Sequence, residues 1–324
     1  MSEVETRGAP RPDQATIAAF VAVVLLGSLN AIAVKQSVTE LAPFWSAGSR
    51  FVIAAILLLG LVLGTRRALP RGRGLVGTLA YGVIGFAGTF GFVYPALQEV
   101  PAGTGMVFLA LVPLLTFALA VLHGQERFRV QGLLGALIAL AGVAVVFADQ
   151  LSAAVPIGAM LAIIVGTVLL AEGSIILKSV PHSDPFSTNA VAMLAGGLVL
   201  LGLSTVWGER WLLPTRPETW LAMGHLVLLG SIVLFALYLF ALTRWTASAV
   251  SYVTLLMPLV TVPLAALLFS ERVSGLLAVG GLLAVAGVYV GAFLHFRPRR
   301  TPTTILPECP PVQASAAGQG SPAR

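Results

Sequence analysis

Residues 111–127 read LVPLLTFALAVLHGQER, and residues 256–272 read LMPLVTVPLAALLFSER. A shift of 145 positions extends this match over residues 100–148 and 245–293 without a gap, with 17 identities in 49 positions. Shared apolar composition explains only part of the agreement, because the identities include a proline, a threonine, a Glu-Arg pair and two glycines in register. The chain therefore contains an internal repeat.

The composition predicts that lipid is the main solvent of this chain. Of its 324 residues, 57% are hydrophobic and 10% are charged, and the mean hydropathy is +0.95. Ordinary soluble domains contain about 45–50% apolar and about 25% charged residues. A water-soluble globule of this composition could not cover its surface with polar groups. A soluble enzyme is thus excluded, and a membrane protein is predicted.

Ten apolar runs, each long enough to cross a bilayer, account for most of the chain. They cover residues 16–35, 44–63, 74–95, 102–122, 129–148, 156–177, 186–206, 218–240, 248–269 and 274–295. Each repeat then holds five spans, and an odd number means that the two halves cross the membrane in opposite directions. The predicted fold class is all-α: a polytopic membrane protein with ten transmembrane helices in two inverted five-helix repeats.

The domain boundaries follow from this count. We expect a disordered N-terminal tail at 1–14, the first repeat at 15–148, the second at 149–295, and a disordered basic Pro-rich tail at 296–324. The single cysteine, Cys309, lies in the second tail, so neither an intramolecular disulfide nor a cysteine metal site is expected. The first apolar run lacks a signal-peptide cleavage site and is expected to remain as a helix.

Basic residues in the short loops predict the orientation. With a cytoplasmic N-terminus, fourteen Lys and Arg residues face the cytoplasm and five face the other side, in agreement with the positive-inside rule. Both termini are therefore expected on the cytoplasmic side of the cell inner membrane. Since the basic residues serve as topology signals, no nucleic-acid partner is expected. The expected partners are lipid and a small-molecule solute, and the protein is expected to be a monomer or a homodimer.

Three stretches carry a family resemblance: GSLNAIAVK at 27–35, PFWSAGSRFVIAAILLL at 43–59, and the doubled P…T…ER hairpins quoted above. In their order and duplication they are similar to the EamA-like group of the drug/metabolite transporter superfamily, over about residues 15–295. The resemblance implies a ten-helix bundle with a central cavity lined by the first, third, fourth, sixth, eighth and ninth helices. It also implies transport of small metabolites, often amino acids or drugs. One departure is LAEGSIILK at 170–178, since an intramembrane glutamate is not part of a general family pattern.

Ionisable groups inside a span are candidate functional residues, because each costs at least about 2.5–3.5 kcal/mol at the centre of the bilayer. Glu172, in the inner half of the sixth span, is the candidate for carrying a proton or for holding a substrate amine. The alternative is a structural hydrogen bond to a neighbouring helix. His225 in the eighth span is expected across the cavity from Glu172, and its alternative is a neutral imidazole bonded to a carbonyl.

Uncharged polar side chains supply four more candidates for substrate binding. Asn30 and Ser28 are expected to face the cavity from the first span, although an asparagine also joins helices through hydrogen bonds. Tyr94 and Tyr252 are cavity candidates near the ends of the third and ninth spans, although tyrosine is also common at the membrane interface.

Three basic residues near span ends are expected to have structural roles. Lys35 and Arg50 resemble positions where the family carries a basic residue, and both side chains are long enough to reach the headgroups. Lys178 closes the sixth span and is interpreted as a topology residue.

Two prolines are expected to shape the cavity. Pro113 and Pro258 lie in the middle of the fourth and ninth spans, and each frees the carbonyl four residues earlier, at Leu109 and Thr254. Symmetric kinks would act as hinges, or would offer backbone polar groups to a substrate, which makes Thr254 a candidate binding residue. The alternative is a static kink.

Together these features predict a secondary transporter for an amino acid-like or drug-like solute. The expected mechanism is alternating access to a midplane cavity, in the efflux direction and with optional proton coupling. A membrane-embedded enzyme is the first alternative, but the sequence has no His-Glu-x-x-His or Gly-x-Ser-x-Gly motif. A channel is the second, and would require an oligomeric ring of polar groups. No cofactor, metal or ATP site is expected.

The topology is testable with reporter fusions. Cytoplasmic reporters fused after Arg73, Arg127 or Arg300 should be active, and fusions after Gln98 or Arg272 should report the opposite side. If the Gln98 and Arg127 fusions reported the same side, the inverted ten-helix arrangement would be wrong.

Overall fold

A computed structural model describes residues 13–126, 128, 130–152, 154–179, 181, 184–245, 250–251 and 253–293. The expected disordered tails lie almost wholly outside these residues. The helical elements are α1 (Gln14–Val38), α2 (Pro43–Gly64), α3 (Arg73–Tyr81), η1 (Gly82–Gly88), α4 (Thr89–Glu99), α5 (Ala102–Leu109), α6 (Val112–Leu122), α7 (Val130–Ser152), α8 (Ile157–Lys178), α9 (Pro185–Val206), α10 (Pro217–Val227), η2 (Leu228–Val233), α11 (Leu234–Arg244), α13 (Val253–Phe269) and α14 (Gly275–Phe293).

The all-α prediction is confirmed, and every predicted apolar run falls on helical structure in the described part of the chain. Seven helical segments there are long and apolar enough to cross a membrane. Three shorter apolar helices cover Val130–Val146, Leu256–Phe269 and Gly275–Gly287. The third span consists of α3, η1 and α4, the fourth of α5 and α6, and the eighth of α10, η2 and α11.

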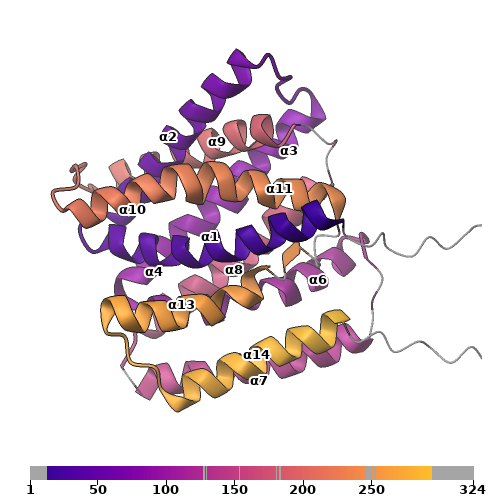
Figure 1. The fold of residues 1–324 in the computed structure, drawn as a ribbon, viewed down its shortest axis with the longest axis vertical. Helices are drawn as coiled ribbons and strands as arrows, with labels where there is room; N and C mark the ends of the chain where they lie inside the picture. Colours follow the sequence, from indigo (N-terminus) through magenta and orange to yellow (C-terminus); the bar gives the residue numbers. More distant parts are fainter. Residues whose placement is uncertain are drawn as a thin grey trace, which may run out of the picture. The chain divides into compact units, whose positions relative to one another are not determined.

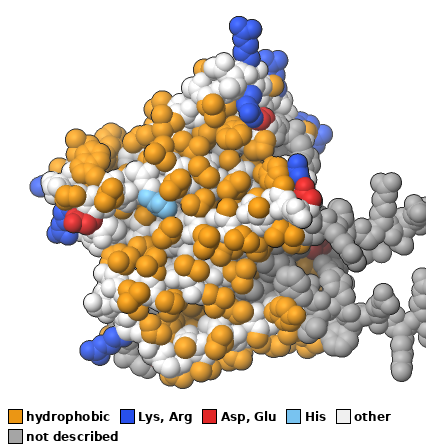
Figure 2. Space-filling view, in the orientation of Figure 1, with side chains coloured by type: hydrophobic (Ala, Val, Ile, Leu, Met, Phe, Trp, Pro, Cys, Tyr) orange, Lys and Arg blue, Asp and Glu red, His pale blue; other side chains and the backbone are white. Residues whose placement is uncertain are grey.

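Large apolar side chains cover the outside of the bundle. Leu122, Leu267 and Val206 are each more than three-quarters exposed, which would be unfavourable in water. Figure 2 shows apolar side chains across the middle of one face, with the basic and acidic side chains near its edges. This distribution suits helices whose middle sections contact lipid and whose ends reach the headgroups.

Acidic side chains are placed at the starts of helices, where backbone N–H groups lack partners. Asp184 accepts hydrogen bonds from Phe186 N and Ser187 N at the start of α9. Glu209 does the same for the first turn of α2, and Glu271 accepts from Ala102 N and Gly103 N at the start of α5, at 2.8 and 3.2 Å. Glu40 lies outside the spans, and hydrogen bonds lower the pKa of its carboxyl group to about 2. The largest contribution comes from Thr215.

Two lysines bind the C-terminal ends of helices, where backbone carbonyls lack partners. Nζ of Lys35, at the end of α1, donates to the carbonyls of Leu97 and Val100 at 2.6 and 3.0 Å. Nζ of Lys178, at the end of α8, donates to the carbonyls of Leu242 and Trp245 at 2.5 and 2.7 Å. The two acceptor pairs are 145 residues apart, so the repeat extends to these contacts. Their structural role agrees with the sequence-based interpretation, but both lysines bind backbone rather than reaching for headgroups.

Equivalent helices of the two repeats pack against each other: α2 lies along α9, and α7 lies along α14 (Figure 1). Small residues allow the close approach in the second pair. A Cβ added to Gly142 would clash with the backbone of Gly280 and Ala284, and one added to Gly287 would clash with the backbone of Gly135 and Ala139. These contacts are reciprocal, as expected for two copies of one sequence pattern facing each other.

The third and eighth spans share a local irregularity. Residues 82–88 and 228–233 are π-helical, and a shift of 145 places 83–88 on 228–233. Short π-helical segments within α-helices are frequent at functional sites, and here one lies between α3 and α4 and the other between α10 and α11.

The glycine contact predicts the effect of a larger side chain. Gly142→Leu should lower the free energy of unfolding by roughly 1–3 kcal/mol through overpacking, measured as a lower melting temperature of the purified protein in detergent. Gly60→Leu in α2 is the control, because a Cβ there meets nothing within 4 Å. Equal melting temperatures for both variants would contradict the close packing of α7 on α14.

Candidate functional site

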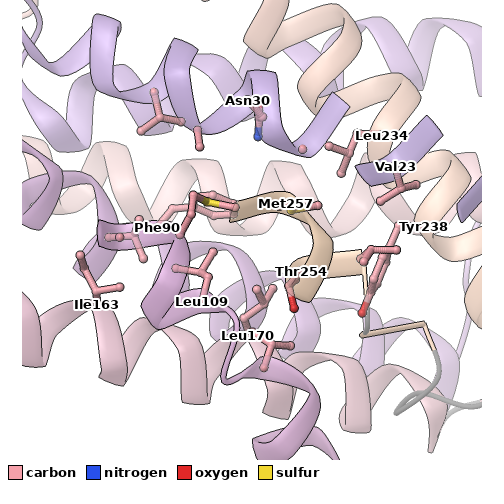
Figure 3. A pocket seen from close by; sticks show the side chains of 18 of the residues that line it. Val23, Asn30, Phe90, Leu109, Ile163, Leu170, Leu234, Tyr238, Thr254 and Met257 are labelled. Carbon is pink, nitrogen blue, oxygen red and sulfur yellow. The ribbon is translucent and has the colours of Figure 1, made fainter. Parts of the chain in front are cut away.

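A pocket lies at the centre of the bundle, between the two repeats (Figure 3). Its walls come from α1, α3, α4, α5, α6, α8, α11, α13 and the adjoining Ser251. These elements belong to the first, third, fourth, sixth, eighth and ninth predicted spans. The pocket walls thus come from the same six spans that the family resemblance implied for a central cavity.

The pocket walls are mainly apolar, with a few polar groups at separate places. Asn30 points into the pocket from α1, while Tyr238 and Thr254 lie toward its other end (Figure 3). The hydroxyl of Tyr238 shares a hydrogen bond of 2.8 Å with Ser174, and that of Thr254 donates to the carbonyl of Ser251 at 2.7 Å. None of the described lining residues is charged. Such a surface suits a largely apolar solute that is oriented by a few hydrogen bonds.

Both residues whose carbonyls the central prolines release, Leu109 and Thr254, line the pocket. The helix breaks between α5 and α6, directly before Pro113, whereas Pro258 lies inside the continuous helix α13. The expected symmetry of the two kinks is therefore incomplete. Pro258 itself lines a separate apolar cavity beside α14.

Arg50 is fully buried beside the pocket, and this was not expected for a residue assigned to the headgroups. Nε donates to Oγ of Ser231 and Nη1 to the hydroxyl of Tyr94, both at 2.8 Å, and Nη2 donates to the carbonyl of Gly230 at 3.0 Å. Two of these acceptors belong to η2. Tyr94 is fully buried, accepts this hydrogen bond from Arg50 and is not among the residues that line the pocket.

Glu172 is not among the pocket-lining residues. Its carboxylate lies 3.4 Å from Nε2 of His123, which follows α6, and both side chains are partly exposed. The Nδ1 atom of His123 lies 2.9 Å from the carbonyl of Leu119. His123 therefore has a partner that the sequence alone did not reveal, because the two residues come from different repeats.

The remaining candidates differ in position. Oγ of Ser28 donates to the carbonyls of Val24 and Met257 and thereby joins α1 to α13, outside the pocket. His225 is half-buried and does not line the pocket, and its Nε2 atom has no partner among the described residues. Tyr252 lies outside the described residues. No group of three or more possible metal ligands occurs in the part that the structure describes.

Comparison with known proteins gives a family match and a group of named relatives. The EamA-like transporter family matches residues 14–148 and 157–292. An uncharacterized inner membrane transporter, YedA of Escherichia coli K12, is 30% identical over 86% of this chain and 91% of its own. A probable amino-acid metabolite efflux pump of Salmonella typhimurium is 26% identical over 86% of this chain and 95% of its own.

A solved crystal structure supports the same fold. It superposes with a TM-score of 0.65 over 87% of this chain and 97% of its own, at 22% identity. The family match falls separately on the two halves of the chain, which confirms the internal repeat found in the sequence. The protein is a multi-pass membrane transporter rather than an enzyme, and it belongs to the EamA-like transporter family.

Proposed function

We propose that the protein is a secondary transporter that exports a small metabolite, with the central pocket as its substrate site. The observation that carries this proposal is the position of the pocket between the two repeats, with walls from six spans. Relatives named as probable amino-acid metabolite efflux pumps favour an amino acid-like solute and the export direction. The sequence has no ATP-binding motif, so a solute or ion gradient supplies the energy.

Location and assembly are part of the same proposal. The charge asymmetry of the loops supports a cytoplasmic location for both termini, and the relative named YedA is an inner membrane transporter. One chain contains both repeats and the whole pocket lining described above. A monomer is thus sufficient for transport, and a homodimer is the alternative.

The two lysine contacts support alternating access. Lys35 holds the end of α4, and Lys178 holds the end of α11, at equivalent places of oppositely directed repeats. Because the repeats are inverted, the two contacts close the pathway on opposite sides of the membrane. Opening one side then requires the local lysine to release its carbonyls, while the other contact stays intact.

Access to the pocket tests this mechanism. With Cys309 replaced by serine and Ala31→Cys as the single thiol in the pocket wall, Lys35→Met should increase labelling several-fold by an impermeant thiol reagent added on the side of the α4–α5 turn. Lys178→Met should increase labelling from the opposite side. Increased labelling from the same side in both variants would contradict the proposed closures.

We place the proton site at Glu172 and His123. The pair is partly buried, lies on α8 and directly after α6, and joins elements of both repeats. Uptake or release of one proton changes the attraction between the two side chains, and so the free energy of contact between the repeats. Glu172 as an anchor for a substrate amine has less support, because it does not line the pocket.

Loss of titration at this pair should uncouple transport. Glu172→Gln and His123→Gln should each abolish accumulation driven by a pH gradient in proteoliposomes, while solute exchange without a gradient continues. Glu99→Gln, at the exposed end of α4, is the control and should behave like the wild type. Normal pH-driven accumulation in both variants would show that the pair is structural, and loss of exchange as well would favour the substrate anchor.

A further inference from the structure

We infer that the pocket binds its solute through a carboxylate, with the positive charge of Arg50 as the selecting group and without a partner for an ammonium group. This inference rests on the proposed function and names the substrate class. It starts from the charge of Arg50, with which no carboxylate pairs in the described part of the protein.

Arg50 is fully buried, and each of its three hydrogen bonds ends on a neutral acceptor. Its guanidinium also lies over the rings of Phe51 and Phe90, at 4.7 and 5.4 Å from their centroids. Ion pairs of other described residues, such as Arg67 with Asp184 and Arg244 with Asp13, lie elsewhere, as does the contact between His123 and Glu172. A buried cation without a counter-ion is costly, so the site favours an anion from outside the chain.

The pocket is where such an anion can approach. Phe90 and Asn30 line it, and both belong to the surroundings of Arg50. A Cβ added to Gly230 would clash with Oδ1 of Asn30 and would lie 3.5 Å from Nη2 of Arg50, so the three residues meet at one place. Oδ1 of Asn30 is buried without a hydrogen-bond partner among the described residues, although its amide points into the pocket (Figure 3).

The rest of the pocket selects against cations. It has no carboxylate among its described lining residues, and its body is formed by apolar side chains such as Leu109, Leu234 and Met257. At low dielectric the charge of Arg50 repels a cationic solute and attracts an anionic one over several ångströms. The favoured solute therefore has a carboxylate next to Asn30 and an apolar body beside Phe90 and Met257.

Four compounds with the same phenyl group test this selection: 3-phenylpropanoate, phenylalanine, 3-phenylpropanol and phenethylammonium. Binding to the purified wild-type protein is measured by calorimetry at neutral pH. The propanoate should bind at least ten-fold more tightly than the alcohol and the ammonium compound, and no more weakly than phenylalanine. Tighter binding of the ammonium compound, tighter binding of phenylalanine, or binding by none of the four would overturn the inference.

A counter-ion built into the protein provides the second test, which avoids removing the buried arginine. Asn30→Asp places a carboxylate beside Arg50, so it should preserve or raise the melting temperature and reduce binding of the propanoate at least ten-fold. Asn30→Leu removes the amide without adding charge and should reduce binding of the propanoate less than Asn30→Asp does. Unchanged propanoate binding in a folded Asn30→Asp variant would refute the role of Arg50. Binding without any flux in proteoliposomes would support this inference and reject the transporter proposal.

Discussion

Backbone groups at the ends of buried helices need partners from within the protein, and this requirement organises the bundle. In a bilayer an unsatisfied carbonyl or N–H group costs several kcal/mol. Lys35 satisfies two carbonyls at the end of α4, and Glu271 satisfies two amides at the start of α5. One turn between two spans is thus held by a lysine and a glutamate from different repeats. Lys178 holds the end of α11 in the equivalent way.

This use of negative charge also accounts for the lack of a counter-ion at Arg50 among the described residues. Glu271, Glu209 and Asp184 are all bound to helix N-termini, where their negative charge meets the positive end of the helix dipole. These three carboxylates therefore stabilise helix starts. Among the described residues, Arg50 has the single fully buried guanidinium group. This group contacts only hydroxyls, a carbonyl and aromatic rings.

The sequence predicted the helices and the repeat well, and it predicted the contacts between side chains less well. The hydrophobic runs predicted the helices, and the shift of 145 positions predicted the repeat. Both could be predicted because the length of an apolar run and the spacing of matching residues are read directly from the sequence. Burial of Arg50 and the pairing of Glu172 with His123 were not predicted, since position along a helix gives depth in the membrane but not the direction of the side chain. Asn30 was predicted to face the cavity and lies in its wall, whereas Ser28, two residues earlier, bonds to α13 instead. A difference of two positions rotates a side chain by more than half a turn around the helix.

The two repeats share their helices and the lysine contacts at helix ends, but they differ at Arg50 and Glu172. The shared and the differing residues have different consequences. If Pro43-Phe44 at the start of α2 is aligned with Pro185-Phe186 at the start of α9, Arg50 falls on Ala192. If Lys35 is aligned with Lys178, Glu172 falls on Leu29. In the mechanism proposed above, the repeated residues close both ends by the same contacts, so the two states are related by a pseudo-two-fold rotation and have similar free energies. Under the same proposal the unrepeated residues make those states chemically different, since a solute near Arg50 and a proton on Glu172 would each act on one repeat more than on the other. The proposal therefore assigns selectivity and direction to the positions where the two repeats have diverged.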